Sequence, residues 1–135
     1  MDKKQNENLA GARLPRLVEE AVALMELDYA YLAGVDDLAQ RLAVSKCHLV
    51  RTFSAAMGQP PGQYLTMVRL EAAKLYLTGR EYPVETIAGL TGFSGGNYFC
   101  KVFRKATGMS PGKYRAKYGA AASKREPPGE RESFV

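Results

Sequence analysis

The sequence predicts an all-α protein of about seven helices, and two observations carry this prediction. Apolar residues recur at steps of three and four along most of the chain, which places them on one face of a helix. No segment shows the alternation of apolar and polar residues that is typical of a strand. With 135 residues, the chain is expected to form one compact domain or two very small ones.

The expected helices are separated by residues that end or begin helices. Glycine ends a helix because it adopts the left-handed backbone without strain, and proline suits the first turn, where its missing N–H costs no hydrogen bond. Asp36, Ser45 and Ser94 are expected to cap helices, because short polar side chains accept a hydrogen bond from a free amide. In chain order, the expected helices are residues 14–32, 37–43, 46–57, 62–78, 84–90, 97–106 and 111–118.

The longest expected helix, residues 62–78, begins beside Pro61 and ends at Gly79. Its apolar stripe is expected to consist of Leu65, Val68, Ala72 and Leu75. The two ends of the chain, residues 1–12 and 119–135, are polar or charged and poor in apolar residues. Both ends are therefore expected to be disordered.

Two stretches of the chain repeat one pattern. "VSKCHLVRTFSAAMGQPPGQY" begins at Val44, and "FSGGNYFCKVFRKATGMSPGKY" begins at Phe93. The copies match at a distance of 49 residues as far as Ser45 and Ser94, and at 50 residues afterwards, so one residue is inserted around "GGN". Matched pairs include Ala39 with Ala88, Val44 with Phe93, Leu49 with Phe99, Arg51 with Lys101, Phe53 with Phe103 and Tyr64 with Tyr114. This match indicates two copies of one supersecondary unit.

The matched positions predict a helix-turn-helix in each copy. A small residue stands where two helices cross, a bulky one fills the turn, and two apolar residues four positions apart face the core. A basic residue of each copy, Arg51 or Lys101, lies on the opposite side of the second helix. In such a unit the first helix braces the second, which lies in the major groove of DNA. The expected organisation is a first subdomain of residues 13–59, a linker helix of residues 60–79 and a second subdomain of residues 80–118.

The charge distribution favours an anionic partner for the repeated stretches. The formal net charge is +5, which alone says little. No Asp or Glu occurs from Leu38 to Leu70 or from Thr86 to Arg125, although both windows contain lysines and arginines. Basic charge is therefore concentrated on the two copies and their flanks.

The sequence offers no catalytic set and no cofactor site. One histidine, His48, and two cysteines, Cys47 and Cys100, cannot form a four-ligand zinc site. No glycine-rich phosphate loop follows a strand and no carboxylates pair on one helix face, so no enzyme is expected. The chain contains no apolar run that could span a bilayer and no signal peptide, which predicts a cytoplasmic protein without a membrane partner.

The repeat resembles a known family. "DDLAQRLAVSKCHLVRTFSAAMGQPPGQY" followed by "VETIAGLTGFSGGNYFCKVFRKATGMSPGKYR" is similar to the DNA-binding domain of AraC/XylS-type transcription regulators. The motifs "GFS", "YF" and "VFRKATGMSPGKYR" fall in the order and spacing of that family. The resemblance implies two helix-turn-helix subdomains joined by a long helix, with two reading helices in successive major grooves of double-stranded DNA. Such grooves are about 34 Å apart and a helix of roughly seventeen residues spans about 25 Å, so one monomer can reach both once the subdomains are added.

The resemblance also implies which residues meet DNA. From the first reading helix these are Lys46, Cys47, Val50 and Arg51, and from the second they are Gly95, Gly96, Asn97, Cys100 and Lys101. Arg51 is suited to guanine and Asn97 to adenine, because their side chains can form two hydrogen bonds with those bases. Contacts with phosphates are expected from Lys101, Arg104 and Lys105.

Some of these positions depart from the family's pattern. Cys47 and Val50 form poorer hydrogen bonds than the long polar side chains often found there, and they are expected to meet a thymine methyl group. Gly95 and Gly96 provide no side chains to read bases. The second subdomain is therefore expected to contribute affinity and DNA-shape sensing more than base readout.

Several alternatives remain open at this point. The resemblance implies an activator that binds an asymmetric site as a monomer and contacts RNA polymerase. The chain is either a stand-alone regulator, which its native-looking start favours, or the excised DNA-binding half of a larger ligand-sensing regulator. A helical adaptor for another protein is the alternative from a different class, and it would lack salt-dependent affinity for DNA. Four side chains are expected to pack in the interior: His48, Tyr64, Tyr76 and Tyr114.

Overall fold

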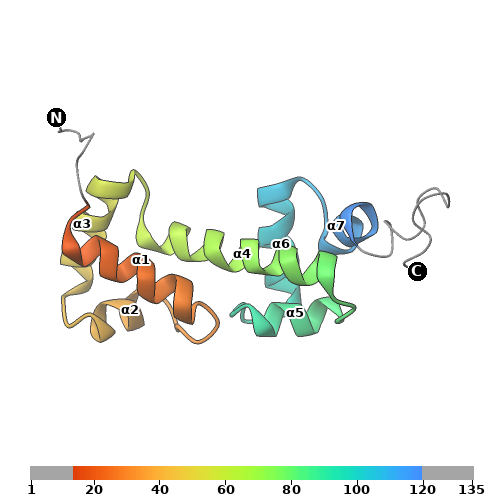
Figure 1. Ribbon diagram of the computed structural model, residues 1–135, viewed down its shortest axis with the longest axis horizontal. Helices are drawn as coiled ribbons and strands as arrows, with labels where there is room; N and C mark the ends of the chain where they lie inside the picture. Colours follow the sequence, from red (N-terminus) through yellow and green to blue (C-terminus); the bar gives the residue numbers. More distant parts are fainter. Residues whose placement is uncertain (1–13, 120–135) are drawn as a thin grey trace. The chain divides into compact units, whose positions relative to one another are not determined.

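The computed structural model describes residues 14–119. These residues form seven helices and no strand, as the sequence predicts (Figure 1). The chain divides into two compact units, with the boundary between Thr66 and Met67. That boundary lies inside the longest helix, α4 (Pro61–Gly79), so the predicted linker helix contributes to both units.

The first unit contains α1 (Arg16–Asp28), α2 (Val35–Arg41), α3 (Lys46–Met57) and the start of α4. These helices lie together in Figure 1, and their inward faces are apolar. Side chains with no exposed surface include Val18, Met25, Leu38, Leu49 and Phe53. Burial of these groups is the main stabilising contribution to the unit.

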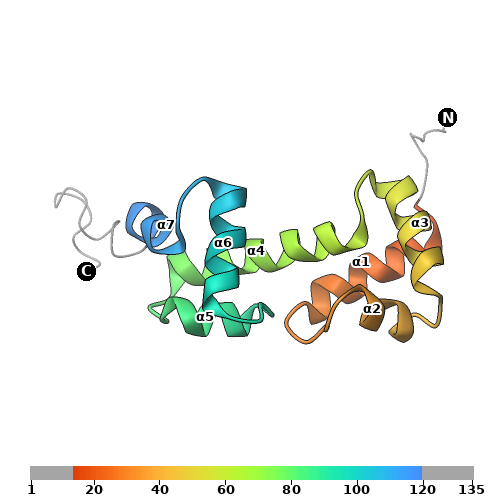
Figure 2. The same ribbon diagram turned by 180° about the vertical axis from the view of Figure 1, so that it is seen from behind.

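The second unit contains the rest of α4, α5 (Val84–Leu90), α6 (Gly96–Thr107) and α7 (Pro111–Tyr118) (Figure 2). Its core includes Leu77, Ile87, Phe99 and Phe103, all nearly or fully buried. Aromatic rings form a continuous series through this core. Successive centroids lie 5.0 Å apart for Phe93 and Phe99, 5.6 Å for Phe99 and Phe103, and 5.3 Å for Phe103 and Tyr114.

The two helix-turn-helix units are α2–α3 and α5–α6, and both share a left-handed residue in the turn. Ala43 has a φ of 59°, and Gly92, at the matching position, has a φ of 93°. The small residues at the helix crossings, Ala39 and Ala88, are 3% and 0% exposed. The expected internal repeat is thus present in backbone conformation as well as in packing.

The starts of α2 and α6 differ from those predicted. Gly34, rather than Asp36, precedes α2, and no side chain caps this helix. Asp37 lies in the first turn of α2, and its carboxylate accepts a hydrogen bond from the backbone N–H of Ala33 at 2.9 Å. The helix therefore begins two residues earlier than expected, because a carboxylate within the helix reaches back to the preceding segment.

Ser94 does not cap α6, although its counterpart Ser45 caps α3. The Oγ of Ser45 accepts a hydrogen bond from the backbone N–H of His48 at 3.0 Å. Gly95 occupies the cap position of α6, which has no side-chain cap. The inserted residue displaces Ser94 one position away from the helix start, so the repeat register misled the prediction.

The predicted apolar stripe of α4 is also wrong in part. Leu75 is 75% exposed, whereas Leu70, Ala73 and Leu77 are buried in the core of the second unit. Leu65 is buried in the first unit. A single stripe with one period cannot describe a helix that supplies two separate cores.

The interior predictions for aromatic and histidine side chains had different outcomes. Tyr64 is buried, with its hydroxyl donating to the carboxylate of Glu26 at 2.9 Å, and burial together with that carboxylate raises the pKa of Tyr64. Tyr76 and Tyr114 pack against the core of the second unit. His48, by contrast, is exposed on α3, so the prediction that it packs beside Leu49 is wrong.

Candidate nucleic-acid interface

The reading helix of the first unit is α3. Leu49 and Phe53 fix one face of this helix in the core, and Cys47 and Arg51 are exposed elsewhere on it. Val50 is half-buried. The Ser45 cap and the left-handed Gly58 satisfy backbone groups at the two ends, which keeps the helix in a defined position for its exposed side chains.

Only part of the positive charge in the first unit is available to a partner. Arg41 is held by Asp28 and by Asp37, whose carboxylate lies 3.2 Å from its guanidinium. The side-chain hydrogen bonds with these acids, first Asp37 and then Asp28, raise the pKa of Arg41. Lys46 lies 3.4 Å from Asp36, but both side chains are well exposed, so this ion pair opposes an outside contact only weakly.

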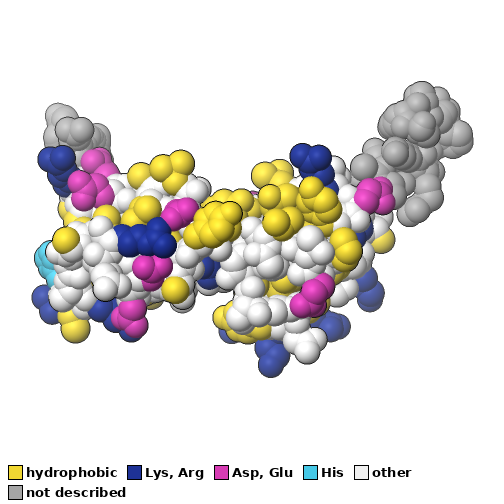
Figure 3. Space-filling model, turned by 90° about the horizontal axis from the view of Figure 1, so that it is seen from below, with side chains coloured by type: hydrophobic (Ala, Val, Ile, Leu, Met, Phe, Trp, Pro, Cys, Tyr) yellow, Lys and Arg dark blue, Asp and Glu magenta, His cyan; other side chains and the backbone are white. Residues whose placement is uncertain are grey.

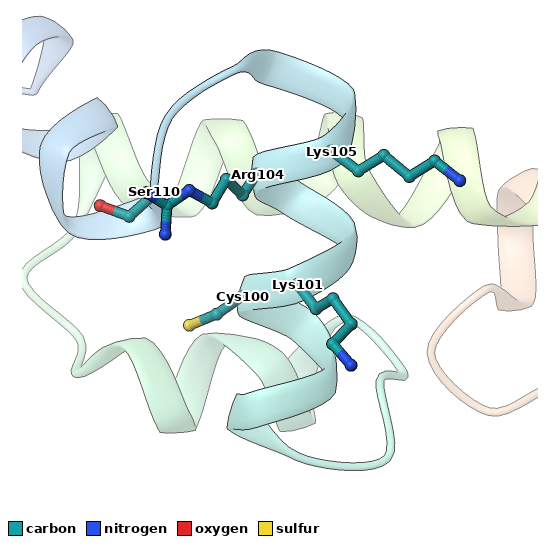
Figure 4. Close-up of a pocket in the computed structure, with 5 residues that line it drawn as sticks. All are labelled: Cys100, Lys101, Arg104, Lys105 and Ser110. Carbon is teal, nitrogen blue, oxygen red and sulfur yellow. The ribbon is translucent and has the colours of Figure 1, made fainter.

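The reading helix of the second unit is α6, and it is strongly basic from its middle to its last turn. A hollow of about 440 Å³ is lined by four residues of α6, Cys100, Lys101, Arg104 and Lys105, together with Ser110. Figure 4 shows Lys101 and Lys105 extending to one side of α6, and Cys100 and Arg104 to the other, toward Ser110. Four of the residues predicted to meet DNA are therefore brought together around one surface depression.

Ser110 was not among the residues predicted to meet DNA. It caps α7 by accepting a hydrogen bond from the backbone N–H of Lys113 at 3.2 Å. Its position before Pro111 is a capping signal that the sequence displays. Nothing in the sequence, however, indicates that the start of α7 borders the basic face of α6.

The matching surface of α3 is much less basic. At the positions that correspond to the hollow on α6, the first unit has Val50, Arg51, Ser54, Ala55 and Pro60. One cation thus stands where the second unit has three. The difference lies entirely in exposed or half-buried positions, because the core positions of the two helices match.

The start of α6 consists of glycines, so no side chain projects from it. Gly95 precedes the helix with an extended φ of −177°, and Gly96 is its first residue. Asn97 follows and is exposed. A Cβ added at Gly96 would clash with Oε1 of Glu85, a residue of α5 that was also absent from the predicted site.

Other kinds of site find little support in the part of the chain that the structure describes. Within residues 14–119, no three His, Cys, Asp or Glu side chains are grouped so that they could hold a metal ion. None of the described helices is both long and apolar enough to cross a membrane. Cys47 and Cys100 are both free thiols, the first exposed and the second half-buried.

Comparison with known proteins identifies the family. A family model described as a helix-turn-helix domain matches residues 38–117. A putative AraC-like transcription regulator of Streptomyces antibioticus is 35% identical over 107 residues, which cover 79% of this chain and 35% of that protein. The chain thus spans about a third of the length of this curated relative.

Solved structures agree with the sequence relationship. The C-terminal domain of AraT, a response regulator from Geobacillus stearothermophilus, is 29% identical with a TM-score of 0.76, covering 80% of this chain and 90% of that one. The DNA-binding domain of AdpA, a global transcriptional factor solved in complex with a target DNA, is 30% identical with a TM-score of 0.73, covering 82% of this chain and 97% of that one. With its two helix-turn-helix units, the chain therefore belongs to the AraC-type family of transcription regulators.

Proposed function

We propose that this chain binds double-stranded promoter DNA sequence-specifically and regulates transcription, with α3 and α6 in successive major grooves. The observation that carries the proposal is the duplicated helix-turn-helix, whose two second helices each expose a cation opposite a buried apolar face. The similarity to the DNA-binding domain of AdpA, which was solved on its target DNA, supports this proposal. Two reading helices in one chain allow binding to an asymmetric site as a monomer.

The two reading helices have different roles in this proposal. On α3, Arg51 pairs with guanine, Cys47 and Val50 meet a thymine methyl group, and Lys46 adds a cation at the helix start. The basic hollow of α6, which Cys100 also lines, holds phosphates through Lys101, Arg104 and Lys105. Asn97 is the remaining polar side chain near the start of α6, and it reads adenine.

Selection of bound sequences from a random duplex pool tests the proposal. The expected product contains two half-sites about one helical turn apart, with the better-defined one under the first unit. Affinity for the selected site is expected to fall steeply with added salt, because each phosphate contact releases counterions. A pool without enriched sequences, together with affinity that does not respond to salt, would exclude DNA binding and leave the adaptor alternative.

The proposal extends to the direction of regulation and to a protein partner. Activation through contact with RNA polymerase in the cytoplasm is what the family resemblance implies. Large apolar side chains that could make a protein contact are exposed: Leu27 is 84%, Tyr31 is 78% and Leu75 is 75% exposed. Apolar atoms are visible on the face drawn in Figure 3. Transcription in vitro from a promoter carrying the selected site tests this extension, and reduced transcript would contradict activation.

A further inference from the structure

The carboxylate of Glu85 occupies the space beside the first residue of α6. Glu85 lies in the first turn of α5, and its Oε1 stands so near Gly96 that a Cβ there would clash with it. The side chain is exposed, and within residues 14–119 its carboxylate has no hydrogen bond or ion pair. The first amides of α6 lack a side-chain cap, and their positive end of the helix dipole favours a carboxylate at this place.

At the matching positions of the first unit, the acid is paired with a cation. Asp36 corresponds to Glu85, and it forms an ion pair with Lys46 at 3.4 Å. Lys46 corresponds to Gly96 once the inserted residue is counted. The second unit therefore has an acid at the matching position of its first helix, but a glycine instead of a cation at the matching position of its reading helix.

An unpaired carboxylate at this place must affect how the unit binds DNA. The first residues of a reading helix are those that contact base edges in the major groove, and a carboxylate repels the phosphates that helix starts otherwise attract. It can only accept hydrogen bonds. Cytosine presents the N4 amino donor without a neighbouring acceptor, whereas guanine and thymine present acceptors and adenine adds an acceptor at N7.

We propose that Glu85 is a specificity-determining residue that selects cytosine at the base pair facing the start of α6. This inference rests on the proposed DNA binding by the helix-turn-helix units. It assigns a base preference to the start of α6, where the cap residue Gly95 and the first helical residue Gly96 have no side chains to provide one. The selecting group comes instead from the preceding helix of the same unit.

Selection from a random duplex pool is repeated with the unaltered chain, Glu85→Gln and Glu81→Gln. Glu81 is an exposed acid in the segment before α5, so its variant matches the change of charge. Arg51→Ala identifies the half-site of the first unit, because the base preference that it relaxes must belong to α3. In the other half-site, the unaltered chain and Glu81→Gln are expected to enrich one cytosine, and Glu85→Gln is expected to lose that enrichment alone.

Binding to single synthetic duplexes gives the magnitude. Replacing the selected cytosine is expected to weaken the unaltered chain about tenfold, but Glu85→Gln by less than about twofold. Gly96→Lys provides an independent variant, since it restores the acid–cation pair of the first unit and is expected to remove the same preference. Gly96 is half-buried, but the atom in the way is the far end of the exposed Glu85 side chain, which can move aside. Thermal melting checks that each variant is folded.

The outcomes separate this inference from the proposed function. Two enriched half-sites with identical base frequencies for the unaltered chain and Glu85→Gln would overturn the role of Glu85 and leave DNA binding intact. A preference for guanine or thymine at the affected position would overturn it as well. Failure of the unaltered chain to enrich any sequence would instead overturn the proposed function itself.

Discussion

The two reading helices, α3 and α6, have the same length of 12 residues and end at a left-handed glycine, yet their exposed faces differ. On α3, a serine caps the start and a single arginine stands in the middle of the exposed face. On α6, two glycines stand at the start, and three cations between the middle and the last turn surround a hollow. Packing constrains the inward residues of a duplicated unit, whereas its exposed residues are free to differ in role.

The cores of the two units also differ in kind. Phe53 in the first unit packs against one aromatic ring, Tyr64, with centroids 5.7 Å apart. Phe103 in the second unit packs against two, Phe99 and Tyr114. Both phenylalanines are completely buried, so they differ in their aromatic neighbours and not in their degree of burial.

The largest expected effect is the loss of either phenylalanine. Phe53→Ala and Phe103→Ala are each expected to destabilise their unit by about 3–5 kcal/mol. Phe103→Ala should cost more, because each aromatic pair contributes about 0.5–1.5 kcal/mol beyond burial. Urea unfolding gives the free energies, and hydrogen exchange assigns each loss to one unit. Phe103→Leu is the control that retains most of the volume; an alanine variant as stable as the parent would place Phe103 outside the core.

The next effect concerns the two exposed cations at matching positions. Arg51→Ala is expected to cost about 1–3 kcal/mol on the selected site and to relax the preference at one base pair. Lys101→Ala is expected to weaken binding about equally on all sequences and to reduce the salt slope by about one. Titration of selected and random duplexes at several salt concentrations measures both. Arg16→Ala, which removes an exposed cation from α1, is the control, and an equal loss for Arg51→Ala on random DNA would make Arg51 a phosphate contact.

A smaller effect is expected in the turns. Gly92→Ala should destabilise the second unit by about 1–2 kcal/mol, because its φ of 93° is strained for a residue with a Cβ. Ala43→Gly should stabilise the first unit by less, since glycine loses more backbone entropy on folding, roughly 0.5–1 kcal/mol. Thermal unfolding measures the change in stability of both variants. Destabilisation by Ala43→Gly would show that the backbone at Ala43 is not strained.

Much of the fold could be predicted because core positions and helix ends obey local rules. Ser45, Gly58 and Gly108 cap helices as expected, because each forms or permits a hydrogen bond within its own turn. The prediction that Ser94 caps α6 was wrong because the sequence does not show on which side of the helix start the extra residue lies. The predicted apolar stripe of α4 was wrong in part because periodicity cannot show that one helix supplies two cores.

The candidate site could be predicted only where one helix provides it. Lys101, Arg104 and Lys105 lie on α6 at helical spacing, so their common surface follows from the sequence. Ser110 and Glu85 reach α6 from neighbouring elements. Their participation depends on how the helices pack and on space left by a missing side chain, which spacing along the chain does not reveal.

The smallest expected effect is a difference between the units in acid. The hydrogen bond from the Ala33 amide, followed by the one from Arg41, lowers the pKa of Asp37. A lowered pKa stabilises the folded state above the ordinary value near 3.8 and ceases to do so as pH falls through the lowered value. The matching positions in the second unit are Thr86 and Leu90, which carry no charge.

Acidification below about pH 4 should therefore weaken the first unit through Asp37 without an equivalent loss in the second. Asp37→Asn should remove this part of the acid response, which NMR signals of each unit can follow during thermal melting. Asp36→Asn is the matched control, because it removes a neighbouring charge but not the bond to the Ala33 amide. An unchanged acid response in Asp37→Asn would mean that this bond does not distinguish the two units.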